Sequence, residues 1–152
     1  MRTMIHALSP VDHSFRERFE SCLVPPESFD HRAHLRLAYV YLAGYDDNVA
    51  AGLMRAALVN FIRHQGIDAS KYHETLTRAW LLAVRHFMQG TPPTGSADDF
   101  IDRNARLLDT GIMLTHYSRE LLFSDEARRG FVEPDLSPIP RMSNPPRSSP
   151  AS

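Results

Sequence analysis

The amino-acid sequence predicts an all-α protein, a compact bundle of about five helices with a disordered C-terminal tail. Apolar residues recur at spacings of three and four along several segments, and no alternating β-branched run indicates a strand. Capping or helix-breaking residues bound each of these segments. The chain has 152 residues, of which 43% are hydrophobic, enough for one domain with a real core. We therefore expect a single helical domain over residues 1–140.

The first two predicted helices lie before the turn at Gly44. The amphipathic segment SFRERFESCL ends before Pro25 and Pro26, which would interrupt a helix. The second helix is expected to begin near Asp30, a suitable N-cap, and to reach Ala43.

The next two helices form the centre of the chain. One is expected from about Asn48 to Gln65, with Gly66 ending it. The other is expected to be capped by Ser70 and to end at Gly90. Its predicted inward stripe consists of Leu76, Trp80, Ala83, Val84 and Phe87.

Shorter helical pieces complete the predicted domain. Ser96, with Asp99 three residues later, resembles a capping box, and Ser124 is expected to cap the last turn, DEARR. No aromatic residue follows Phe131, and six of the 11 prolines lie in the stretch 134–150. Residues 141–152 have too little apolar surface to offset chain entropy, so we expect them to be disordered.

Composition excludes several classes of function. The formal net charge is -1, and no basic run indicates nucleic-acid binding. Cys22 is the single cysteine, so an internal disulfide is excluded and a reducing compartment is expected. The N-terminal region lacks the apolar core of a signal peptide, and no stretch is long enough to cross a bilayer. We expect a cytoplasmic protein without membrane or nucleic-acid partners, and its oligomeric state is not predicted.

Four of the eight histidines are predicted to meet at one end of the bundle. His31 and His34 extend the apolar stripe of the second helix backwards, and His73 does the same for the fourth. His64 extends the stripe of the third helix forwards. Short connections favour antiparallel neighbours, so the starts of the second and fourth helices would lie beside the end of the third.

This cluster predicts a mononuclear metal centre with His31, His34 and His73 as ligands and His64 as a further candidate. Helix N-termini disfavour imidazolium, and a neutral imidazole offers the lone pair that a metal needs. Three histidines with one open position are typical of catalytic zinc or iron(II). The alternative is that each histidine is a hydrogen-bonded core residue, and His64 also fits a cation that caps a helix C-terminus.

Other side chains complete the hypothesis. Glu74 or Asp109 would supply a proton-transferring carboxylate, and Arg119 or Arg128 would hold an anionic group of a small-molecule substrate. Glu74 also fits a solvated ion pair with Arg78. Four residues are candidates to line the pocket, although each also fits an ordinary core position: Tyr41, Tyr72, Thr77 and Trp80. For Thr77, a hydrogen bond to its own backbone is the preferred interpretation.

Three other kinds of site are disfavoured. The inward stripes contain no acid for a di-iron carboxylate centre. Neither a G-x-S-x-G motif nor a cysteine with a partner histidine supports a nucleophile, and no glycine-rich loop would cradle a phosphate.

Three segments, FDHRAHLRLAYVYL, KYHETLTRAW and YSRELLFSDEARRGFVEPDLSPIP, resemble a group of small bacterial proteins of unassigned function. The shared pattern is F-x-H-x-x-H-L, Y-H-E-T-x-T and L-x-S-x-x-A-R…P-D-L, and the resemblance covers about residues 29–140. The residues on motif positions are Phe29, His31, His34, His73, Glu74, Thr75, Thr77, Ser124 and Arg128. The resemblance implies that these segments form a functional centre, and it implies no particular activity.

Two hypotheses of function follow. The first is a metal-dependent enzyme that acts on a small molecule. With zinc its reaction would be a hydrolysis or an isomerisation, and with iron(II) it would use oxygen. The second is a non-catalytic module that binds a small ligand or a protein, with its histidines as hydrogen-bonding groups in a pocket.

Overall fold

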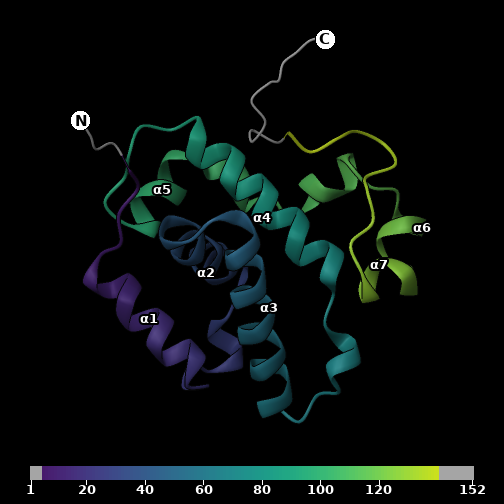
Figure 1. Ribbon diagram of the computed structural model, residues 1–152, viewed down its shortest axis with the longest axis horizontal. Helices are drawn as coiled ribbons and strands as arrows, with labels where there is room; N and C mark the ends of the chain where they lie inside the picture. The colour runs from purple at the N-terminus through teal and green to yellow at the C-terminus, as the bar shows by residue number, and fades with distance from the viewer. Residues whose placement is uncertain (1–4, 141–152) are drawn as a thin grey trace.

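The computed structural model describes residues 5–140, and this part of the chain is helical with no strand, as predicted (Figure 1). Five of its α-helices have seven or more residues: α1 (Pro10–Glu20), α2 (His31–Gly44), α3 (Asp47–His64), α4 (Glu74–Gln89) and α5 (Ala97–Arg103). Two short helices follow, α6 (Arg119–Leu122) and α7 (Asp125–Arg129). The 3₁₀ turns are η1 (Pro26–Ser28), η2 (Ala69–Lys71), η3 (Ala105–Leu108) and η4 (Thr110–Thr115). The predicted tail, 141–152, lies outside the described residues.

Helix α2 is the central helix of the fold. Its buried side chains point in every direction around its axis. They include Leu37, Tyr39 and Val40, so they do not form a single stripe on one face. This happens because α1, α3, α4 and α5 all pack against α2. Figure 1 shows α2 nearly along its axis while α3 and α4 lie across the view, so α2 crosses both helices. The predicted parallel arrangement of the second and fourth helices is therefore wrong.

Several predicted helix caps are present. The side chains of Asp30, Ser96 and Ser124 each accept a hydrogen bond from the backbone N–H three residues later. Gly66 follows α3 with a φ of 77°, a conformation that glycine adopts without strain. These caps are local in sequence, which is why the sequence predicts them.

Two helix starts differ from the prediction. Helix α1 begins earlier, at Pro10, because Ser9 and Asp12 form a reciprocal capping box. Helix α4 is capped by His73, whose ring accepts a hydrogen bond from the N–H of Leu76. Ser70, the predicted cap, lies in η2 instead.

The C-terminal part of the domain packs against the start of α4. The Thr75 hydroxyl donates to the carbonyl of Gly130 over 2.8 Å and accepts from the N–H of Val132 over 3.1 Å. Figure 1 shows α6, α7 and the yellow segment after them gathered beside this end of α4. The arrangement brings the C-terminal motif segment to the His73 end of the helix.

No helix within residues 5–140 combines the length and the apolar character needed to span a membrane.

Candidate functional site

His31 is the first residue of α2, and its ring lies edge-on against Trp80 of α4 with a centroid distance of 4.6 Å. Its Nε2 lies 2.9 Å from the carbonyl oxygen of Leu107. A carbonyl can only accept, so Nε2 carries the proton and donates. In the neutral ring the lone pair is then on Nδ1. His31 thus joins α2 to η3 and packs against α4.

His34 lies one turn further along α2 and has a different environment. Its ring is partly exposed and packs edge-on against Phe29, with a centroid distance of 5.5 Å. The ring makes no hydrogen bond to any residue between 5 and 140. Burial, and to a smaller extent the neighbouring His31, lower the pKa of His34 to about 4. At neutral pH this ring is uncharged and offers both a donor and an acceptor.

His73 is fully engaged in hydrogen bonds. Its Nδ1 accepts from the N–H of Leu76 over 3.1 Å, and its Nε2 donates to the carbonyl of Leu122 over 2.7 Å. Burial lowers the pKa of His73; the bond to Leu122 opposes this shift, and the charge of Arg128 adds to it. The neutral ring has no lone pair left for a metal.

The predicted metal centre is not formed by this arrangement. Within residues 5–140, no group of three or more His, Cys, Asp and Glu side chains is placed so that it could hold a metal ion. His64 ends α3 and is exposed, so its predicted inward orientation is wrong. The crossing of α2 over α3 and α4 explains why the four rings do not share one point.

Arg128 of α7 has an unmet hydrogen-bonding group. Its Nε is the one buried side-chain nitrogen or oxygen in the described part of the chain that lacks a hydrogen-bond partner. Its Nη1 lies 3.7 Å from a carboxylate oxygen of Asp125, a residue whose side chain is 82% exposed. Arg128 also lies close enough to His73 to affect its pKa. Buried unsatisfied donors are rare in folded proteins, so this group requires an explanation.

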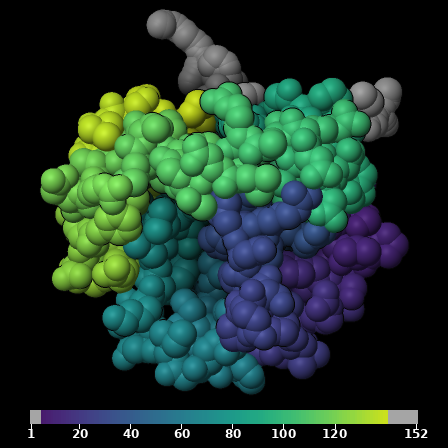
Figure 2. Space-filling view, turned by 180° about the vertical axis from the view of Figure 1, so that it is seen from behind, coloured from purple at the N-terminus to yellow at the C-terminus, as the bar shows by residue number. Residues whose placement is uncertain are grey.

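The surface at this end of the fold is concave. Figure 2 looks onto the face where the start of α2 (blue), α4 (teal) and the segment of α6 and α7 (lime green) come together. It shows a hollow between the blue and the lime-green atoms, with teal atoms lying deeper.

Glu74 is a buried partner of arginine rather than a solvated ion pair. Arg55 of α3 binds both of its carboxylate oxygens, Tyr72 donates to it over 2.9 Å, and Arg78 lies at 3.7 Å. Burial acts to raise the pKa of Glu74, but the bonds from Arg55 and Tyr72 outweigh it and lower the pKa overall. The carboxylate is thus ionised and fully bonded, which does not suit the predicted role in proton transfer.

Like Tyr72, which donates to Glu74, two further predicted pocket residues have structural partners. The Thr77 hydroxyl donates to the carbonyl of His73, as expected for a backbone bond. Tyr41 is fully buried and its hydroxyl donates to Glu20, whose proximity together with burial raises the tyrosine pKa.

The other predicted residues are separated. Trp80 is buried beneath His31, while Arg119 is exposed at the first residue of α6. Asp109 lines a different cavity, together with His86 and His116. The sequence did not predict that association.

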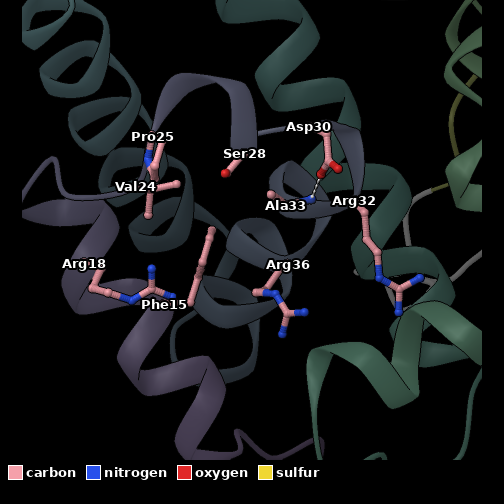
Figure 3. Close-up of a pocket in the computed structure, with 9 residues that line it drawn as sticks. All are labelled: Phe15, Arg18, Val24, Pro25, Ser28, Asp30, Arg32, Ala33 and Arg36. Atoms are coloured by element: carbon pink, nitrogen blue, oxygen red, sulfur yellow. Dashed lines mark hydrogen bonds between the residues drawn. The ribbon is translucent and has the colours of Figure 1, made fainter.

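A shallow cavity of about 300 Å³ lies between α1 and the start of α2 (Figure 3). Arg18, Arg32 and Arg36 line it, but Arg32 and Arg36 are held in ion pairs with Asp98, and Arg36 also binds the buried Asp12. Figure 3 shows Arg18 on α1 separated from the two α2 arginines by Phe15. Arg32 and Arg36 cross-link α1, α2 and α5, and the three arginines do not converge on a free anion site.

No known protein family, no curated protein and no solved structure matches this chain.

Proposed function

We propose that the protein binds a small anionic molecule at the end of the bundle where α2, α4 and α7 meet, using Arg128 and His34. The observation that carries this proposal is the buried Nε of Arg128, which has no partner within residues 5–140. A guanidinium with an unsatisfied Nε–H is suited to a carboxylate or phosphate group, which arginine binds through two parallel hydrogen bonds.

His34 supplies the second recognition group. Its neutral ring, with a pKa of about 4, has a free N–H and a free lone pair. A base this weak transfers protons poorly at neutral pH, where the most effective catalytic pKa lies near the operating pH. This favours a role for His34 in binding over a role as a general base.

His31 and His73 fix neighbouring elements of the fold. The bond from His31 to Leu107 ties η3 to α2, and the bond from His73 to Leu122 ties α6 to the start of α4. Phe29 and Trp80 add aromatic surface against the two α2 histidines. The histidines thus act as hydrogen-bonding and packing groups, which is the second of the two hypotheses from the sequence. A metal-dependent enzyme would require His73 to give up one of its two bonds.

Titration with sodium phosphate and with sodium acetate, followed by NMR of the arginine and histidine side chains, tests the proposal. We expect saturable shifts of the Arg128 Nε–H signal. Arg128→Gln should bind these anions about tenfold or more weakly, since a charge-assisted bond contributes about 1.5–3 kcal/mol.

Arg129→Gln is the matched control, because Arg129 is the exposed neighbour on the same short helix. It should bind both anions as the parent does. Equal weakening in the two variants, or no saturable shift in the parent, would overturn the proposal. Circular dichroism of each variant establishes that the helical fold is retained.

A further inference from the structure

A separate cavity of about 520 Å³ lies between α4, the 3₁₀ turns η3 and η4, and the segment that ends at Pro140. Leu107 lines it, and the carbonyl of the same residue accepts the bond from His31. The turn η3 is therefore linked through His31 to the start of α2. The volume falls within the range of about 300–1,000 Å³ that is typical of small-molecule pockets.

The floor of the cavity is apolar. It is formed by Ala83, Phe87, Leu107, Ile112 and Ile139. Leu107 and Ile139 are buried in the core, which makes this surface continuous with the folded interior. A ligand that fills the cavity would therefore bury an aliphatic or aromatic group.

Two opposite charges border this apolar floor. The guanidinium of Arg106 lies over the ring of Phe87, with its Cζ 5.8 Å from the ring centroid, and it makes no ion pair within residues 5–140. Asp109 accepts a hydrogen bond from the N–H of Gly111 through Oδ1 and likewise has no cationic partner in the described chain. One site thus contains an unpaired cation and an unpaired anion.

Two imidazoles add hydrogen-bonding groups. His86 packs edge-on against Phe87, and its ring nitrogens have no hydrogen-bond partner in the described part of the chain. His116 donates from Nδ1 to the carbonyl of Ser137 over 2.8 Å, so its neutral ring has a lone pair on Nε2.

We propose that this cavity binds a free α-amino acid with a large apolar side chain. Arg106 would bind the carboxylate, Asp109 would bind the ammonium group, and the side chain would lie on the apolar floor. A simple carboxylic acid leaves Asp109 without a partner and places a second negative charge beside it. A simple amine has the corresponding conflict with Arg106. Only a zwitterion satisfies both charges at once.

Calorimetric titration with L-phenylalanine, and with L-leucine, tests this inference. Hydrocinnamate and phenethylamine are the matched ligands, because each keeps the aromatic group and lacks one of the two charges. We expect L-phenylalanine to bind and each single-charge analogue to bind about tenfold or more weakly, as for the loss of one charge-assisted hydrogen bond.

The protein variants give an independent check. Arg106→Gln and Asp109→Asn should each weaken binding of L-phenylalanine by about tenfold or more, and Asp109→Asn keeps the oxygen that caps η4. Arg63→Gln, at an exposed position on α3, should leave it unchanged. The same comparison in the Arg128→Gln background separates this cavity from the anion site: Arg106→Gln should still weaken binding of L-phenylalanine there, so failure of this inference is distinguishable from failure of the anion site. Equal binding of hydrocinnamate and L-phenylalanine, or no heat from either amino acid, would overturn the proposal.

Discussion

The ring of His73 joins the first turn of α4 to the carbonyl of Leu122 at the end of α6, over 2.7 Å. The same ring caps α4 through Nδ1, which accepts from the N–H of Leu76. A protonated ring would carry a hydrogen on both nitrogens and could not accept from that N–H. The fold at this end of the bundle therefore depends on neutral histidine.

Acidification should destabilise the protein over the pH range between the unfolded-state and folded-state pKa values of His34. The folded-state pKa of about 4 lies below the ordinary value of 6.5, so the unfolded chain takes up the proton first as the pH falls. This contribution to stability is complete above pH 6.5 and is lost as the pH falls towards 4. We expect a loss of about 2–3 kcal/mol, allowing for partial solvent access to the ring. Urea denaturation at a series of pH values measures it.

His34→Gln should flatten this pH dependence, whereas His13→Gln should not. His13 is an exposed residue of α1, so its side chain is expected to contribute little to folding. If both variants retain the full acid-induced loss, His34 is not the group responsible. The depressed pKa of His73 acts in the same direction, so a smaller residual slope is expected in His34→Gln.

Removing the partner of Glu74 should be strongly destabilising. The Glu74 side chain is 9% exposed and its two carboxylate oxygens are bound by Arg55. Arg55→Met leaves a buried charge without its main partner, and we expect a loss of about 3 kcal/mol in the free energy of unfolding. Chemical denaturation provides the measurement.

Arg78→Met is the comparison, because Arg78 approaches the same carboxylate only to 3.7 Å. The loss in the free energy of unfolding of Arg78→Met should stay below about 1 kcal/mol. Similar losses in the two variants would mean that the bidentate pair with Arg55 contributes no more to stability than the longer contact with Arg78.

The Thr75 hydroxyl should stabilise the packing of the segment after α7 against the start of α4. Thr75→Val keeps the shape of the side chain but leaves the carbonyl of Gly130 and the N–H of Val132 without their partner. We expect a destabilisation of about 1–3 kcal/mol and faster hydrogen exchange at the Val132 amide. Thr75→Ser retains the hydroxyl and should retain slow exchange. Unchanged exchange in Thr75→Val would show that the segment is held by other contacts.

The part of the fold that is encoded locally could be predicted from the sequence. Caps such as Asp30 and Ser124 act on an N–H three residues away, so their pattern is visible without any tertiary information. The neutral state of His34 was also predicted, from the helix dipole, whereas burial is the largest cause in the structure. The start of α1 was missed because Ser9 and Asp12 form their capping box upstream of the apolar pattern.

The candidate site could be predicted only in part, because its geometry depends on how helices cross. His31 and His34 do lie together at the start of α2, as their spacing requires. Sequence spacing gave Glu74 a partner four residues away, Arg78, whereas its main partner is Arg55 on another helix. Likewise, nothing local indicated that Asp109 would line a cavity with His116. Such long-range pairings follow from crossing angles, which the apolar pattern alone does not specify.

Metal analysis provides the last prediction. Because both nitrogens of His73 are engaged with Leu76 and Leu122, zinc must displace a helix cap or a tertiary hydrogen bond to bind there. We expect protein dialysed first against zinc and then against a weak chelator to retain far less than one metal ion per chain. Elemental analysis should give the same result for the parent, His34→Ala and His73→Ala. Near-stoichiometric zinc in the parent that is lost in both variants would instead establish the three-histidine centre, and the chain would then have to rearrange at the start of α4 to release the ring of His73.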